Sequence, residues 1–279
     1  MQTNTVNKIL TWILAIIFAL VALVFAITPF FFMLLNSFKD KFEMLTKGVF
    51  ALPDQLLFQN YQEVLEGDFL QFFFNSIIIL VITLILLIAI SAFAAYPLSR
   101  FNFKMNKVIY SLIVSLMAIP VHVTLIPIFR MTKSTGMYDS IWALIGPNVA
   151  MGIPISVFIL TSFMKALPKE IEEAAEIDGC GKVEMFFRVI LPMSKPGLST
   201  LAIYNGVNIW NEFIFAYTLT QTPSNQPLPL AIWEFQGQYS MNIPLIMAVL
   251  TMTVMPMIIL FILAQDKLVK GMTAGAVKG

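Results

Sequence analysis

The chain has 279 residues, of which 58% are hydrophobic and only 12% are charged, and its formal net charge is +1. A soluble domain usually carries about 25% charged residues, so this composition excludes a single water-soluble core and indicates a membrane protein. The small net charge gives no support to nucleic-acid binding. With one cysteine and one histidine, the chain cannot form an internal disulfide or a cysteine-based zinc cluster.

Six stretches are long and apolar enough for membrane helices, which need roughly 20 mainly apolar residues. The first is too long for the apolar region of a signal peptide, about 7–15 residues, so we expect a retained helix with a kink at Pro29. We expect the fourth to break within residues 146–154, and the fifth is the weakest because three asparagines and Glu212 interrupt it. The six predicted spans cover about 9–35, 72–96, 108–130, 141–164, 197–220 and 244–264.

The lysines and arginines predict how these spans are oriented, because cytoplasmic loops carry an excess of both. With a cytoplasmic N-terminus, 12 of the 17 lysine and arginine residues fall on the inner side. The sequence has no internal repeat and no separate soluble domain. We therefore predict one all-α membrane domain over residues 1–279, with both termini in the cytoplasm. The inner segments are 1–8, 97–107, 165–197 and 265–279.

The inner segment 165–197 is among the most polar in the chain and predicts two short helices. Pro168 suits the first turn of a helix, and the glutamates that follow suit the positive end of its dipole. Gly179 suits a left-handed cap at the end of this helix. One face of the helix carries, at helical spacing, Ile171, Ala174, Ala175 and Asp178.

A second helix is expected from Lys182 to Pro192, with an apolar stripe on one face. The "GCGK" that precedes it resembles a phosphate-binding loop, but Glu176 stands where the first glycine is needed and Val183 where the hydroxyl is needed. We therefore expect no ATP hydrolysis by this chain. From the residues alone, an amphipathic hairpin on the membrane surface and a docking element remain equal alternatives. The stripe consists of Val183, Phe186, Phe187 and Ile190.

The same hairpin resembles the cytoplasmic signature of binding-protein-dependent ABC importer permeases. That signature reads E-A-A, then D-G, then an apolar run that ends in L-P, and here Cys180 replaces the alanine common after D-G. Five further segments are similar to the carbohydrate-uptake, maltose-type branch of the family. They are "FQNYQEVL" (58–65), "NSIII" (75–79), "IPVHVTLIPIF" (119–129), "NIWNEFIFAYTLT" (208–220) and "VKGMTAGAVKG" (269–279).

The resemblance implies a type I ABC importer permease fold with six transmembrane helices, in a bacterial cytoplasmic membrane. It implies a permease core over about 71–266 and a cytoplasmic tail over 267–279. The partners would be a second homologous permease subunit, two ATPase subunits and an extracytoplasmic solute-binding protein. This chain would bind membrane lipid, no nucleic acid and no cofactor, because the ATPase subunits use the ATP and magnesium. The outer segment 221–242 would extend toward the solute-binding protein.

Two sets of residues are implied as contacts with the ATPase. The tail is glycine-rich, and we expect it to be flexible and to reach the ATPase dimer interface through Gly271, Thr273 and Gly275. The hairpin would fit a cleft of one ATPase subunit, with alanines for close approach and Gly179 for the turn. The hairpin contacts would be Glu172, Glu173, Ala174, Ala175, Asp178 and Gly179.

Polar residues inside the spans are candidates for the transport pathway, because such groups face a bundle interior or a water-filled path. Asn205, Asn208 and Glu212 share one helix face. We favour helix–helix contacts for them, each worth about 0.6–2 kcal/mol, over contacts with sugar. Trp210 is expected to pack rather than stack on sugar. Asn148 is a pathway candidate because irregular backbone at membrane depth lines cavities or lies inside protein.

Three other classes of membrane protein fit the sequence less well. A proton- or sodium-coupled carrier would need intramembrane charges or inverted repeats, and only Glu212 and His122 are available. We expect His122 to be an interior residue with satisfied hydrogen bonds rather than a proton relay. A membrane-embedded enzyme would need a catalytic constellation within the spans, and a channel would need no docking hairpin. ATP-driven permease remains the preferred interpretation.

Overall fold

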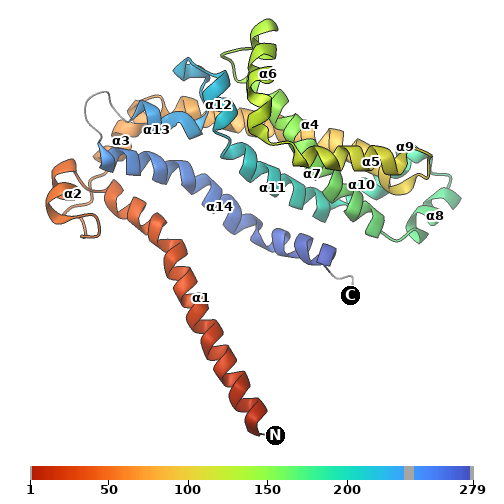
Figure 1. The fold of residues 1–279 in the computed structure, drawn as a ribbon, viewed down its shortest axis with the longest axis horizontal. Coiled ribbons are helices and arrows are strands. Elements are labelled where there is room, and N and C mark those ends of the chain that lie inside the picture. The colour runs from red at the N-terminus through yellow and green to blue at the C-terminus, as the bar shows by residue number, and fades with distance from the viewer. Residues whose placement is uncertain (1, 236–241, 277–279) are drawn as a thin grey trace. The chain divides into compact units, whose positions relative to one another are not determined.

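The computed structural model describes residues 2–235 and 242–276, and the regular structure of these residues is helical. This confirms the predicted all-α class. The chain divides into two compact units (Figure 1). The first comprises Met1–Phe69 and Ile232–Met255, and the second comprises Leu70–Ala231 and Pro256–Gly279.

Four helices in the described residues are long and apolar enough to cross a membrane, and a sharply bent pair makes a fifth if it counts as one span. The predicted spans 9–35, 72–96, 141–164 and 244–264 each correspond to one of the four. The predicted third and fifth spans differ from expectation. The four apolar stretches are Leu10–Ser37, Phe69–Arg100, Trp142–Ala166 and Ile243–Leu263.

The predicted third span is a bent pair rather than one helix. Helix α5 (Asn106–Ser115) and the 3-10 turn η1 (Leu116–Ala118) precede α6 (Val121–Ser134), and the two arms meet at 96° (Figure 1). Pro120 causes the bend, because a proline disfavours helical backbone in the residue before it. Ile119 accordingly adopts φ −79° and ψ 116°, which is extended.

The predicted break in the fourth span is absent. Helix α7 (Trp142–Ala166) runs without interruption through Pro147 and Pro154. Membrane helices tolerate interior prolines where side chains and small local adjustments satisfy the freed backbone groups. Both prolines are buried, so the surrounding packing maintains the helix. Asn148 therefore lies on regular helix and not on irregular backbone.

The predicted fifth span is divided into two helices. Helix α11 (Lys195–Trp210) ends before the polar "NEF" segment, and α12 (Ile214–Leu219) begins after it. The Glu212 carboxylate accepts hydrogen bonds from the backbone N–H groups of Phe215 (2.7 Å) and Ala216 (3.1 Å). A side-chain acceptor at this place satisfies N–H groups that a new helix leaves without intrahelical partners, so Glu212 starts a second helix.

The first unit contains α1 (Gln2–Ser37), α2 (Lys41–Lys47) and α3 (Gln59–Glu66). None of the most apolar window of α1 is buried inside the structure. After α1, the chain folds over the side chain of Lys39, which is fully buried and donates from Nζ to Asn36 Oδ1 (3.0 Å) and to the carbonyl of Gly48 (3.2 Å). Burial lowers the pKa of the Lys39 amine, and the nearby Glu43 carboxylate acts in the opposite direction.

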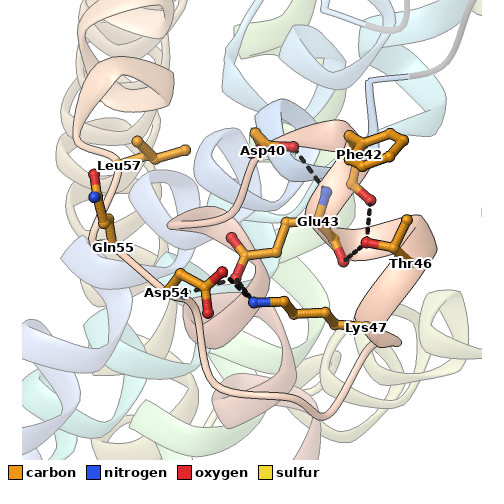
Figure 2. Close-up of a pocket in the computed structure, with 8 residues that line it drawn as sticks. All are labelled: Asp40, Phe42, Glu43, Thr46, Lys47, Asp54, Gln55 and Leu57. Carbon is orange, nitrogen blue, oxygen red and sulfur yellow. Dashed lines mark hydrogen bonds and ion pairs between the residues drawn. The ribbon is translucent and has the colours of Figure 1, made fainter.

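A pocket of about 360 Å³ lies beside α2 in the first unit (Figure 2). Its wall contains an ion pair between Lys47 and Asp54. The Glu43 carboxylate accepts a hydrogen bond from the backbone N–H of Asp54 at 2.6 Å. These contacts connect α2 to the segment before α3, a local fold that the sequence did not indicate.

The second unit is built on α4 (Phe69–Arg100), α7 and α11, whose apolar side chains share one buried cluster. Gly152 of α7 lets Leu87 of this cluster pack directly on its backbone, because a Cβ added at Gly152 would lie 2.1 Å from Leu87 Cδ1 of α4. The amide oxygen of Asn205 would be 3.0 Å from the same Cβ. The cluster comprises Leu87, Ala92, Ala95, Tyr96, Leu160, Met164, Met185, Phe186, Ile190 and Leu201.

Gly152→Val is expected to destabilise the second unit by about 1–3 kcal/mol, the usual cost of overpacking a core. The thermal stability of the detergent-solubilised protein measures the effect. Leu87→Ala in the same chain should recover part of the loss, because it removes the side chain that the new Cβ meets. Equal stability of Gly152→Val and wild type would show that α4 and α7 are not in close contact here.

Candidate functional site

A pocket of about 310 Å³ lies among α6, α7, α11 and α12 of the second unit, and its largely apolar wall carries a few polar side chains. It brings together four of the five pathway candidates predicted from the sequence, although they come from two distant parts of the chain. Met151 and Tyr204 contribute apolar and aromatic surface to the same wall. The four candidates on the wall are Asn148, Asn205, Asn208 and Glu212.

Asn205 connects the two long helices beside the pocket. Its side chain is buried, and Nδ2 donates to Ser156 Oγ of α7 (3.0 Å) and to the Leu201 carbonyl of its own helix (3.0 Å). Ser156 Oγ in turn donates to the Gly152 carbonyl (2.6 Å). Asn205 therefore makes a helix–helix contact at the base of the pocket wall.

Asn148 and Asn208 present amides to the pocket while remaining bonded to their own helices. Asn148 Nδ2 donates to the Leu144 carbonyl and Asn208 Nδ2 donates to the Tyr204 carbonyl, each at 2.8 Å. An amide side chain offers two donor hydrogens and an acceptor oxygen. One bond to the helix therefore leaves each group with the capacity to bind a hydroxyl-rich ligand.

Two other residues singled out in the sequence lie elsewhere. Trp210 is buried and packs edge-on against Phe73, with ring centroids 6.0 Å apart, and it does not line the pocket. His122 is exposed in the first turn of α6. The prediction of an interior histidine was therefore wrong, because the bend at Pro120 turns α6 away from α5.

The hairpin forms as the sequence predicted in its first half. Helix α8 (Glu170–Ile177) is followed by Gly179 with φ +84°, a left-handed conformation that glycine adopts without a Cβ penalty. The Cys180 N–H donates to the Ala175 carbonyl at 2.9 Å and closes the cap. The hairpin lies at the same end of the second unit as the last turn of α4 (Figure 1).

The candidate ATPase contacts on the hairpin divide into two groups. Glu173, Ala174, Asp178 and Gly179 are exposed. Ala175 packs against the buried cluster of the second unit. Glu172 points inward, where its Oε1 lies 2.6 Å from Nε of Arg100 on α4. Four of the six predicted ATPase contacts are thus exposed, and the other two make contacts inside the second unit.

The apolar stripe of the second limb is also divided. After α9 (Lys182–Met185), residues Phe186–Ile190 form a π-helical turn, which precedes α10 (Leu191–Met193). Phe186 and Ile190 are buried, whereas Val183 and Phe187 are exposed. A π turn closes i→i+5 hydrogen bonds instead of i→i+4, so side chains expected on one α-helical face are separated.

The tail differs from the expected flexible segment. Helix α14 (Ile243–Ala276) includes the backbone of Gly271, Thr273 and Gly275, and residues 277–279 lie outside the described residues.

The segment 221–230 of the predicted outer loop is anchored by Asp139, a residue that the sequence analysis did not single out. Asp139 has φ 57°, which aspartate tolerates better than most residues. Its Oδ1 accepts N–H groups of Gln221 (2.8 Å) and Thr222 (2.9 Å), and its carbonyl accepts Asn225 Nδ2 (2.7 Å). An aspartate in the short polar turn "YDS" between two apolar spans was the available signal.

Helix α4 contributes a second anchor to the same loop. Asn75 Nδ2 donates to the carbonyls of Ser224 (2.8 Å) and Gln226 (2.9 Å), and Ser76 Oγ accepts the Leu228 N–H (2.8 Å). Residues 221–230 are therefore held by the turn between α6 and α7 and by the first part of α4. Residues 236–241 of the predicted loop lie outside the described residues.

Asp139→Ala is expected to loosen residues 221–226. Burial acts to raise the pKa of this carboxyl, but hydrogen bonds from Thr222 and Gln221 outweigh it, so the pKa lies below its ordinary value of 3.8. A lowered carboxyl pKa stabilises the fold above the ordinary value and loses this effect only as pH falls through the lower one. Hydrogen exchange of the backbone amides of residues 221–226, divided by the intrinsic exchange rate at each pH, should therefore show equal protection at pH 7 and pH 5, and weaker protection in Asp139→Ala at both. Weaker protection of the parent at pH 5 than at pH 7 would contradict the assignment.

The fold and the matched sequence identify the family. Residues 87–274 match the family model described as "Binding-protein-dependent transport system inner membrane component". A putative ABC transporter permease protein, ORF2, from Caldicellulosiruptor sp. (strain Rt8B.4) is 49% identical over 94% of this chain and 96% of its own length.

Two further proteins are similar to this chain, one in sequence and one in fold. The melibiose/raffinose/stachyose import permease protein MelC of Bacillus subtilis (strain 168) is 36% identical over 90% of this chain and 91% of its own. A crystal structure of a bacterial ABC transporter involved in the import of alginate has the same fold, with a TM-score of 0.80 and 20% identity over 95% of this chain and 98% of that chain. The chain belongs to the binding-protein-dependent transport system inner membrane components and is a permease subunit of an ABC transporter.

Proposed function

We propose that this chain is one of two homologous permease subunits of an ATP-driven sugar uptake system in a bacterial cytoplasmic membrane. In this proposal it forms half of the transport pathway, and two separate ATPase subunits drive it through residues 168–196. An extracytoplasmic solute-binding protein delivers the sugar. The observation that carries the proposal is the exposed Glu173–Ala174 surface of α8, on a hairpin that connects two pathway-lining helices.

The topology in this proposal has six membrane crossings with both termini in the cytoplasm. The bent α5–α6 pair would be the third crossing, and α11 with α12 would together be the fifth. Support comes from the charge distribution, since cytoplasmic segments carry an excess of lysine and arginine. This orientation puts the hairpin on the cytoplasmic side and residues 221–230 on the outer side, toward the solute-binding protein.

Coupling in this proposal follows from covalent connection. The hairpin joins α7 to α11, and both helices line the pocket that contains Asn148 and Asn208. When ATP binding closes the ATPase dimer, movement of the docked hairpin would shift the two pocket walls together. This chain would bind no nucleotide, since ATP and magnesium belong to the ATPase subunits. Its own contribution is to hold the hairpin rigidly and to present amides along the pathway.

A sugar as the transported solute is supported by the pocket and by the relatives. Amide side chains such as Asn148 and Asn208 can donate to and accept from hydroxyl groups. The MelC relative is named for import of melibiose, raffinose and stachyose. Oligosaccharides are therefore the first solutes to test.

Reconstitution tests the proposal directly. The chain would be co-expressed with its neighbouring permease and ATPase genes, reconstituted in liposomes and supplied with the solute-binding protein and labelled oligosaccharides. Uptake should require ATP and every subunit. Transport by this chain without ATP and ATPase would support the carrier or channel alternatives and overturn the proposal.

Gly179→Pro and Glu173→Lys are each expected to reduce ATP-driven uptake at least about tenfold while the protein still inserts, since about 1.4 kcal/mol of lost coupling suffices for that factor. Proline fixes φ near −65°, whereas Gly179 has φ +84°. Lysine at 173 reverses the charge of an exposed contact. Uptake of labelled sugar and the amount of membrane-inserted protein would be measured together, and normal uptake by either variant would refute the coupling assignment.

Deletion of residues 271–279 is expected to impair coupling or regulation more than insertion. The deleted segment begins inside α14, beyond the apolar stretch Ile243–Leu263 that is long enough to span the membrane. Uptake per inserted protein should fall while the amount of inserted protein stays within about twofold, because terminal segments outside a packed core tolerate truncation. Equal uptake with and without the tail would count against a role in ATPase contact.

A further inference from the structure

The cytoplasmic end of α4 contacts both limbs of the hairpin. Arg100, the last residue of α4, places Nε 2.6 Å from Glu172 Oε1 and donates from Nη2 to the Leu167 carbonyl at 3.2 Å. One turn earlier, the Tyr96 hydroxyl donates to the Lys182 carbonyl of α9 at 3.1 Å. The first two contacts hold α8 and its entry, and the third holds α9.

Apolar contacts accompany these polar ones. The Tyr96 ring lies against the Phe186 ring, with ring centroids 5.1 Å apart. The Phe93 ring also stacks on the Phe186 ring, with a centroid distance of 5.1 Å. Both aromatic side chains come from α4, and Phe186 belongs to the π turn of the second limb. The hairpin is therefore packed onto α4 over two successive turns of that helix.

The Arg100–Glu172 pair differs from the exposed ion pairs of the hairpin. Its side chains are only 4% and 18% exposed, whereas Arg188–Glu184 is 77% and 42% exposed. Removing one member of a buried pair leaves an uncompensated charge, which is strongly unfavourable. Both charges also suit their helix ends, since Arg100 ends α4 and Glu172 lies in the first turn of α8. Because separating these two buried charges is costly, we expect the contact between α4 and α8 to persist when the hairpin moves.

We propose that Arg100 is a positioning residue that ties the hairpin to α4, so that α4 moves with the hairpin when the ATPase does. The covalent connections of the hairpin lead only to α7 and α11, and the Arg100–Glu172 pair adds a third helix to the moving group. This inference rests on the proposed docking of the hairpin to the ATPase. Arg100 itself need not touch the ATPase.

Arg100→Ala should leave the assembled transporter able to hydrolyse ATP but lower the sugar transported per ATP at least tenfold. This ratio separates a positioning role from a merely structural one, because misfolding would lower assembly, hydrolysis and uptake together. Arg100→Lys keeps the charge but cannot contact Glu172 and the Leu167 carbonyl at the same time. It should therefore give an intermediate amount of sugar transported per ATP. An unchanged ratio in Arg100→Ala would overturn the inference.

A covalent replacement provides the rescue. In a Cys180→Ser background, Arg100→Cys with Glu172→Cys should transport poorly, and a short thiol crosslinker between the two residues should restore uptake to at least half of the parent. Crosslinking that leaves uptake low, or that lowers uptake further, would show that the contact must open during transport and would overturn the inference. The crosslinker should leave the parent unchanged.

Two controls keep the outcomes separate. Lys47→Ala breaks the exposed Lys47–Asp54 pair in the first unit, so it tests the loss of an ion pair as such and should leave the ratio within twofold of the parent. Crosslinking of Glu173→Cys to the ATPase reports whether the hairpin docks at all. Docking with an unchanged transport ratio in Arg100→Ala would refute only the α4 link, whereas absence of docking in the parent would refute the proposed function.

Discussion

The structure depends on one constraint: a polar side chain within an apolar span lies inside the protein or along a cavity rather than against lipid. The polar side chains around the pocket of the second unit are paired mainly within single helices. Asn148, Ser156, Asn205 and Asn208 each donate to the carbonyl four residues earlier in the same helix. Because these bonds do not depend on a neighbouring helix, the amides stay paired while they line the pocket.

Helix α4 connects the two ends of the second unit. Near its start, Asn75 and Ser76 hold residues 221–230, and at its end Tyr96 and Arg100 hold the hairpin. Its 32 residues correspond to a rod about 48 Å long at 1.5 Å per residue. A helix with polar contacts at both ends and apolar packing between them transmits displacement better than a helix held by apolar contacts alone, because the polar contacts fix its register.

The sequence predicted the parts of the fold that depend on local chemistry. Apolar length identified α1, α4, α7 and α14, and the glycine after α8 has the predicted left-handed backbone. The wrong predictions concern places where tertiary contacts decide whether a helix continues or ends. Buried Pro147 and Pro154 did not break α7, whereas Glu212 divided the fifth span by capping α12. Whether a proline or a carboxylate interrupts a helix depends on the neighbours available to it, and periodicity contains no such information.

In the candidate site, too, some residues could be predicted from local sequence, whereas the roles of others depend on tertiary packing. Composition and spacing placed Asn148, Asn205, Asn208 and Glu212 among the pathway candidates, and the fold brings them to one pocket. Composition and spacing could not show which of the adjacent glutamates of α8 is buried and which is exposed. Successive residues on a helix with 3.6 residues per turn point about 100° apart, so Glu172 meets Arg100 while Glu173 stays exposed. Because Arg100 lies 72 positions earlier in the chain, only the packing of α4 reveals which glutamate is available to a partner.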